Sequence, residues 1–186
     1  MGKLKRYLET GVVYFVTTNT YKRKEIFNNV QVSRFLLFCV GYHKFMLNFN
    51  LFGYVIMPDH IHLLIQPSKK YDLSSIMKSI KGNFARKYNE WTKVSSMLDK
   101  SDGNRHLSAD YRQGLKGNVY KPVWQEGFYD TGLRDEKQIL GWLEYIHWNP
   151  VKKGIVEHQK NYEFSSYHQY FGAKRNKVQL PLETIL

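Results

Sequence analysis

The sequence has few cysteines, few acidic residues and no long apolar run, and each shortage excludes a class of protein. A single cysteine, Cys39, excludes a disulfide framework and a zinc site built from several thiolates. The longest apolar run covers residues 35–40, which is too short to cross a bilayer. The first eleven residues, MGKLKRYLETG, lack the apolar core of a signal peptide. We therefore expect a cytoplasmic protein without a membrane partner.

The shortage of acidic residues leaves a strong positive charge. Lysine and arginine number 28 against 16 aspartate and glutamate residues, a formal net charge of +12. Such an excess predicts a polyanionic partner, with nucleic acid favoured over an anionic membrane. The 186 residues are 42% hydrophobic and 16% aromatic, which is enough to build the packed core of a single domain.

The order of the patterns predicts an α+β fold. The expected strands cover residues 11–20, 50–57 and 60–66, and the expected helices cover 28–47, 73–91 and 135–149. Asp135 with Gln138 resembles a capping box at the start of the last helix, and Pro150 is expected to end it. We expect one domain over residues 1–186, with a mobile polar insertion at 93–121, an irregular segment at 122–134 and a basic C-terminal tail.

Two histidines stand in the third expected strand. Because side chains alternate along a strand, His60 and His62 face one way while Ile61, Leu63 and Ile65 face the other. The two imidazoles could therefore share a metal ion. The alternative is a pair of surface or hydrogen-bonded histidines, which any isolated His-x-His favours. A cupin is disfavoured because the following residues, LLIQPSKK, contain no carboxylate.

The last expected helix carries two further candidates. Tyr145 and Asn149 are four residues apart and lie on the same side of the helix, with Gly141 one turn earlier leaving space beside the phenol. Taken separately, Tyr145 can be an ordinary amphipathic tyrosine and Asn149 a helix-terminal residue before proline. Neither residue indicates a function by itself.

Four motifs together resemble a known family. MPDHIHLLI, VWQEGFYD, YIHWNPVKKGIV and YEFSSY occur in this order, and the set is similar to the single-tyrosine HUH transposases, named for their histidine-hydrophobe-histidine motif. The nearest branch is that of the REP-associated tyrosine transposases (RAYTs). The resemblance implies a ferredoxin-like or RRM-like sandwich with a central antiparallel sheet. The sequence departs from the family at two points. Thr131 stands where members often have histidine, and the polar stretch 93–121 is longer than usual.

The resemblance assigns roles to the candidate residues. It implies that His60 and His62 hold a divalent metal ion, Mg²⁺ or Mn²⁺, with Asn149 as third ligand and Tyr145 as nucleophile. The implied activity is metal-dependent nicking and joining of single-stranded DNA at the foot of a hairpin, through a 5′-phosphotyrosine intermediate. Tyr129 is a rival nucleophile, ranked lower because it lacks a partner ligand one helical turn away.

The partner is expected to be single-stranded DNA that forms a REP-like hairpin. The basic residues expected to contact it are Lys78, Lys81, Arg86, Lys87, Lys152 and Lys153. For any one of these residues a solvated charged face is an equally good interpretation. The resemblance leaves a monomer or a homodimer open, since related insertion-sequence transposases supply the tyrosine helix in trans whereas the RAYT branch includes monomers. We favour a monomer.

Two other functions are compatible with parts of the pattern. A DNA- or RNA-binding regulator that has lost catalysis would keep the basic surface, although the four intact site residues speak against it. A metallohydrolase unrelated to nucleic acid would need only the histidines. Its activity would be indifferent to salt, whereas binding to a phosphate backbone falls steeply as salt rises.

Overall fold

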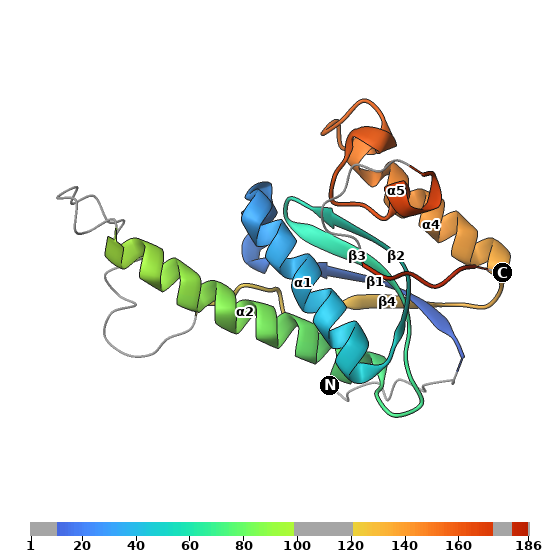
Figure 1. Cartoon of the computed structure of the whole chain (residues 1–186), viewed down its shortest axis with the longest axis horizontal. Helices are drawn as coiled ribbons and strands as arrows, with labels where there is room; N and C mark the ends of the chain where they lie inside the picture. Colours follow the sequence, from blue (N-terminus) through green and yellow to red (C-terminus); the bar gives the residue numbers. More distant parts are fainter. Residues whose placement is uncertain (1–10, 99–120, 173–179, 186) are drawn as a thin grey trace.

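The chain folds into a four-stranded antiparallel sheet with helices on both of its faces (Figure 1). The structure is a computed structural model that describes residues 11–98, 121–172 and 180–185. Its strands and α-helices are, in chain order, β1 (Val13–Asn19), α1 (Val30–Leu47), β2 (Asn50–Met57), β3 (His60–Gln66), α2 (Leu73–Leu98), β4 (Tyr129–Leu133), α4 (Glu136–Lys152) and α5 (Tyr167–Tyr170). The short 3₁₀ helices are η1 (Tyr21–Arg23), η2 (Ile26–Asn28) and η3 (Gln159–Asn161). No helix of the described residues is long and apolar enough to cross a membrane.

The strands lie in the order β2-β3-β1-β4, and each neighbouring pair is antiparallel. The order β-α-β-β-α-β along the chain is that of the ferredoxin-like fold. A two-residue turn, Pro58-Asp59, joins β2 to β3 and pairs Met57 with His60. The predicted α+β class with a ferredoxin-like sandwich is confirmed.

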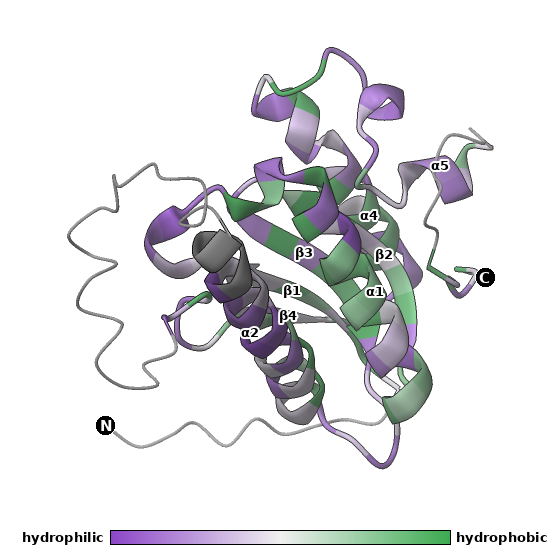
Figure 2. Ribbon diagram, turned by 60° about the vertical axis from the view of Figure 1, so that its left-hand side comes forward, coloured by the Kyte–Doolittle hydropathy of each residue, from purple (hydrophilic) through white to green (hydrophobic). Residues whose placement is uncertain are grey.

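The first face of the sheet holds the larger apolar core. Ile61, Leu63 and Ile65 of β3 pack there with buried residues of α1 and α2. Asn29 caps the start of α1 by accepting the backbone N–H groups of Gln31 and Val32, which α1 itself cannot pair. Much of α2 is hydrophilic in Figure 2, as expected for a helix that buries one side only.

The second face is covered by α4. Leu143 and Ile146 lie in the smaller apolar cluster together with Val55 of β2 and Phe15 of β1. A β-carbon added to Gly53 would lie 2.5 Å from Leu143 Cδ1 and 3.1 Å from Ile146 Cδ1. The missing side chain at Gly53 therefore lets α4 pack closely on β2, which fixes the height of α4 above the sheet.

Three boundaries differ from the sequence-based expectation. The segment 122–134, expected to be irregular, contains the edge strand β4. Helix α2 continues to Leu98 and so includes the first residues of the expected insertion 93–121; the rest of it, and part of the basic tail at 173–179, lie outside the described residues. Helix α4 runs through Pro150 to Lys152 instead of ending near Asn149. Pro150 lies in the last turn, so the break that it makes in the backbone hydrogen bonds falls at the end of the helix.

Candidate active site

His60 and His62 project from β3 toward the α4 side of the sheet. Leu64, the next residue on their side, belongs to the apolar cluster under α4, whereas Ile61 and Leu63 belong to the opposite one. The predicted alternation is therefore present. The two histidines are only 6% and 5% exposed, so they are not surface residues.

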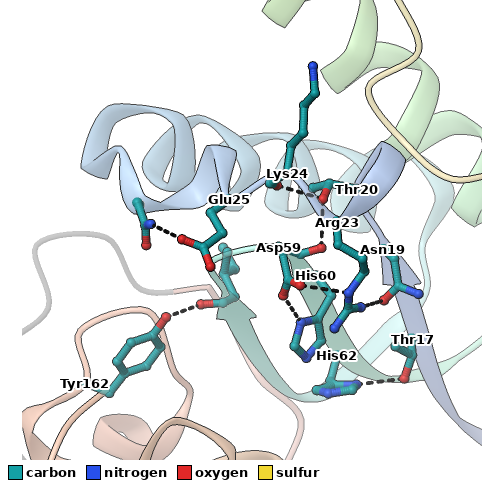
Figure 3. A network of polar contacts seen from close by, with 12 residues as sticks. Thr17, Asn19, Thr20, Arg23, Lys24, Glu25, Asp59, His60, His62 and Tyr162 are labelled. Atoms are coloured by element: carbon teal, nitrogen blue, oxygen red, sulfur yellow. Dashed lines mark hydrogen bonds and ion pairs between the residues drawn. The ribbon is translucent and has the colours of Figure 1, made fainter. Parts of the chain in front are cut away.

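The two imidazoles contact each other edge to face, with ring centroids 4.8 Å apart. Each Nδ1 has a neighbour on the protein: Thr17 Oγ1 lies 2.7 Å from Nδ1 of His62, and Asp59 Oδ1 lies 2.5 Å from Nδ1 of His60 (Figure 3). Within the described residues, neither Nε2 has a hydrogen-bond partner. A ring whose Nδ1–H donates to the protein presents its Nε2 lone pair, as metal-binding histidines commonly do.

The surroundings keep both imidazoles neutral. Burial lowers the pKa of His62 to about 3, and the positive charge of Arg23, together with repulsion from His60 whenever that ring is protonated, acts in the same direction. Burial also lowers the pKa of His60, although the hydrogen bond and charge of Asp59 act in the opposite direction. Metal ions bind the neutral form of histidine, so both rings are in the competent form at neutral pH.

Helix α4 brings Tyr145 next to this pair. The helix begins at Asp135, whose side chain accepts the N–H of Gln138 at 2.8 Å, as the capping pattern predicted. The Tyr145 ring centroid lies 5.8 Å from that of His62. The tyrosine is 38% exposed, so the phenol lies beside the His62 imidazole and is also open to solvent.

Two aromatic side chains hold the Tyr145 ring in place. Trp142 stacks on Phe15 of β1 with centroids 4.0 Å apart. The Tyr145 ring meets both of them edge on, at 5.2 Å from Trp142 and 5.9 Å from Phe15. Because Phe15 also stacks on His62 at 5.1 Å, one aromatic cluster positions both the phenol and one imidazole.

Asn149 lies one helical turn after Tyr145 and is 5% exposed. Its buried Nδ2 has no hydrogen-bond partner in the described residues, which is a costly state for an amide. No group of three histidine, cysteine, aspartate or glutamate side chains that could hold a metal occurs in the same residues. Imidazole nitrogens favour transition-metal ions and an amide oxygen suits Mg²⁺ or Mn²⁺, so this mixed donor set fits a divalent ion and favours Mn²⁺ over Mg²⁺. The role of Asn149 as third ligand stays a prediction.

The predicted DNA-contacting residues fall into two groups. Lys152 Nζ lies 5.2 Å from the Tyr145 ring centroid, and Lys153 is close enough to His60 to lower its pKa. The other four lie on α2, which packs against the opposite face of the sheet. Of these, Lys81 donates to the carbonyls of Gln125 and Gly127, and burial lowers its pKa to about 8.

The remaining residues of the α2 group are on the surface. Lys78 and Arg86 are exposed, and Lys87 forms an ion pair with Glu90 at 2.9 Å. The structure thus brings Lys152 and Lys153 to the histidine site and leaves the α2 residues on another side. DNA contacts by the α2 group stay a prediction.

The rival tyrosine lies on the same face of the sheet as the histidines. Tyr129 of β4 pairs with Thr17, which in turn pairs with His62 in β3. Tyr129 is 61% exposed, and Thr131 Oγ1 donates to its hydroxyl at 2.8 Å. Unlike Tyr145, it has no ring contact with either histidine in the described residues.

Sequence reasoning missed the polar residues behind His60. Arg23 Nε lies 2.7 Å from Asp59 Oδ2, and Arg23 also donates to Asn19 Oδ1. Lys22 and Arg23 have φ of 53° and 54°, in the left-handed region that costs a non-glycine residue about 1–3 kcal/mol. No local pattern predicts such a turn, because lysine and arginine are not typical of it.

Comparisons with known proteins indicate which family the chain is similar to. A family model described as "Transposase IS200 like" matches residues 10–100. A protein of Haemophilus influenzae whose name assigns it to the REP-associated tyrosine transposases is 32% identical over 124 residues, or 65% of this chain and 60% of that protein. Over these residues the chain is similar to this transposase family.

Two further comparisons cover more of the chain. The REP-associated tyrosine transposase of Escherichia coli is 24% identical over 172 residues, which cover 91% of the chain and 84% of the relative. A solved structure of a REP-associated tyrosine transposase bound to a REP hairpin matches with a TM-score of 0.63 and 23% identity. It covers 100% of this chain and 94% of the other, and at that identity the match shows a shared fold.

Proposed function

We propose that this chain is a metal-dependent single-stranded DNA endonuclease and strand transferase that forms a 5′-phosphotyrosine through Tyr145. The observation that carries the proposal is the contact between Tyr145 and His62, with ring centroids 5.8 Å apart, next to two Nε2 atoms without partners in the described residues. A nucleophile and a metal-binding pair must meet at one phosphate, and this contact supports such a meeting.

In the proposed reaction Tyr145 replaces one ester oxygen of the phosphodiester. The phenolic oxygen of Tyr145 attacks phosphorus, and the bond between phosphorus and the 3′ oxygen of the preceding nucleotide breaks. The phenol loses its proton and the leaving oxygen gains one, so the products are a 5′-phosphotyrosine and a 3′ hydroxyl. A different 3′ hydroxyl can then attack the phosphotyrosine in the reverse step and join the strands.

The surroundings of Tyr145 support binding of the phosphate. When held by His60, His62 and Asn149, a Mg²⁺ or Mn²⁺ ion supplies Lewis-acid polarisation of a non-bridging phosphate oxygen. Lys152, 5.2 Å from the Tyr145 ring centroid, adds a positive charge where the phosphate approaches. Lys153, on the next position, adds a second charge near His60.

The DNA partner is a single strand that folds into a hairpin. This part of the proposal is supported by the solved relative that binds a REP hairpin and by the formal charge of +12. Tyr145 and His62, which it contacts, belong to one chain, which supports catalysis in cis, so that a monomer would suffice.

The proposal is tested with an end-labelled, single-stranded oligonucleotide that contains a hairpin and its flanking bases. We expect the full-length chain with Mn²⁺ to form a protein–DNA adduct that survives denaturation, and EDTA to prevent it. A chain that binds hairpins drawn from the DNA around its own gene yet forms no adduct with Mn²⁺ or Mg²⁺ would be the catalytically inactive regulator instead.

A further inference from the structure

The turn between β1 and α1 carries an arginine to the rear of the histidine pair (Figure 3). Arg23 makes two contacts through different nitrogens: its Nε with Asp59 Oδ2 at 2.7 Å, and a terminal nitrogen with Asn19 Oδ1. The other oxygen of the same carboxylate, Asp59 Oδ1, lies 2.5 Å from His60 Nδ1. A continuous chain of contacts therefore runs from Arg23 through Asp59 to one imidazole.

Backbone hydrogen bonds also hold the two turns that carry Arg23 and Asp59. Thr20, which is fully buried, binds the carbonyl of Asp59 through both its N–H and its hydroxyl, each at 2.9 Å. The Thr20 hydroxyl also contacts the carbonyl of Lys24 at 2.7 Å. The turn is thus tied to the β2–β3 turn at the backbone as well as at the side chains.

The conformation of the turn is unfavourable for its sequence. Lys22 and Arg23 are consecutive non-glycine residues with φ of 53° and 54°. Such a conformation persists only where the surrounding contacts impose it, and it occurs preferentially at functional sites. Here the contacts that impose it are those that place the Arg23 guanidinium against Asp59.

We propose that Arg23 is a positioning residue of the metal site, which acts through Asp59 to hold His60 with its Nε2 directed at the metal ion. The inference rests on the proposed function, since it assigns a role toward the metal ion that His60 and His62 are proposed to bind. The planar guanidinium fixes the carboxylate by contacting Asp59 and Asn19 at once, which a lysine ammonium on a flexible stem cannot reproduce.

The charges decide how this chain of contacts works. A lone arginine close to the histidines would repel a divalent cation. When Arg23 is paired with Asp59, the carboxylate offsets its positive charge. The pair can therefore hold the His60 ring in place without repelling the metal ion. Removing Asp59 alone should therefore harm metal binding more than removing Arg23 alone, because it leaves the arginine charge unbalanced.

The test measures Mn²⁺ affinity of the full chain from the electron paramagnetic resonance signal of free Mn²⁺, without DNA. Relative to the unmodified chain, we expect Arg23→Met and Arg23→Lys each to weaken Mn²⁺ binding about tenfold, as for other residues that orient metal ligands. Lys at position 23 keeps the charge and loses the two-point contact. An Arg23→Lys variant with unchanged Mn²⁺ affinity would overturn the positioning role.

A double-mutant cycle with Asp59→Asn tests whether Arg23 acts through Asp59. We expect Arg23→Met to cause no further loss of Mn²⁺ affinity when Asp59 is already Asn, because the intermediate contact is gone and an unbalanced charge is removed. Equal, additive losses in both backgrounds would mean that Arg23 acts directly, and would overturn the inference.

Two controls separate the possible failures. Arg86→Met, an exposed arginine on the opposite side of the sheet, should leave Mn²⁺ affinity unchanged. If the unmodified chain binds no Mn²⁺, or binds it equally with His60 and His62 both changed to Ala, the metal site of the proposed function itself is wrong. If an Arg23 variant does not fold by circular dichroism in EDTA, Asp59→Asn alone carries the test, and an unchanged Mn²⁺ affinity in it contradicts the inference.

Discussion

The two faces of the sheet are built from the same strands but from different kinds of side chain. On the α1 and α2 face, Ile61, Leu63 and Ile65 lie in a large apolar core. On the α4 face, the alternate residues His60 and His62 are also buried but polar, beside a smaller apolar cluster. In such a strand, the apolar residues on one face stabilise the fold by being buried. The other face can then hold polar groups whose burial costs free energy.

The largest effect is expected on the α4 face, at the proposed nucleophile Tyr145. Tyr145→Phe should abolish the protein–DNA adduct, because loss of a nucleophile costs many orders of magnitude in rate. The matched control is Tyr129→Phe, a more exposed tyrosine on the same face of the sheet, which should leave the adduct in place. Adduct formation is measured on denaturing gels with labelled hairpin DNA.

Mixing two inactive variants sharpens this prediction. Tyr145→Phe and His62→Ala chains, combined in equal amounts, should give no adduct, since the tyrosine and the histidine that it contacts belong to one chain. Recovery of the adduct in the mixture would show that the tyrosine acts in trans and would contradict the proposed action as a monomer.

Adjacent residues of β3 should separate stability from metal binding. Leu63→Ala removes a side chain that is 1% exposed and should lower the free energy of unfolding by about 2–5 kcal/mol. His62→Ala loses the hydrogen bond with Thr17 and should cost about 1 kcal/mol, yet it should abolish Mn²⁺ binding. Urea denaturation in EDTA and Mn²⁺ titration measure the two quantities. The opposite ranking of the two unfolding free energies would break the comparison of the faces.

Acid should weaken the α4 side through His147. This residue of α4 is 2% exposed, its Nε2 lies 2.8 Å from Ser166 Oγ, and burial lowers its pKa to about 4. Because the pKa in the folded chain lies below that in the unfolded chain, its contribution to stability is present above about pH 6.5 and is lost as pH falls toward 4.

The expected size follows from the shift. Between pH 7 and pH 5, His147→Gln should reduce the acid-induced loss of unfolding free energy by about 1–2 kcal/mol, at about 1.4 kcal/mol per pKa unit. Urea denaturation of both chains at the two pH values measures it. An identical pH dependence in the two chains would contradict the assignment to His147.

The smallest effect concerns the two groups of cations. Changing Lys152 and Lys153 to Met should weaken single-stranded DNA binding and lower the slope of log affinity against log salt by about 1.4, from about 0.7 per phosphate contact. Changing Lys78 and Arg86 to Met on the other side should lower the slope less. If both double substitutions lowered the slope equally, the DNA would also contact α2. Fluorescence anisotropy across a salt series measures the slopes.

The sequence predicted those features that depend on local periodicity. The alternation in 60–66 placed both histidines on one face, and Asp135 with Gln138 marked the start of α4. The strand β4 was missed because its only buried residue is Leu133, so the edge strand shows no apolar alternation. From the sequence, a proline in the last turn of a helix looks the same as a proline that follows the helix. The expected end of α4 at Asn149 was therefore three residues too early.

The site itself was predictable only in part. Tyr145 and the histidines were connected only through the resemblance to a family; in the structure the Tyr145 ring contacts that of His62, and the roles of these residues stay predictions. Arg23 and Thr17 were not identified, because the first depends on an unusual backbone conformation and the second on a strand pairing between residues 45 positions apart. Long-range contacts of this kind leave no local pattern.

The most direct test identifies the tyrosine that carries the DNA. Trypsin cleavage of the purified adduct at Arg134 and Lys137 separates the peptide of Tyr145 from that of Tyr129, and nuclease treatment leaves a short nucleotide remnant for mass spectrometry. We predict the remnant on Tyr145, bonded through the 5′ phosphate. A remnant on Tyr129, or on any residue outside α4, would contradict the claim that Tyr145 and the histidine pair act on one phosphate.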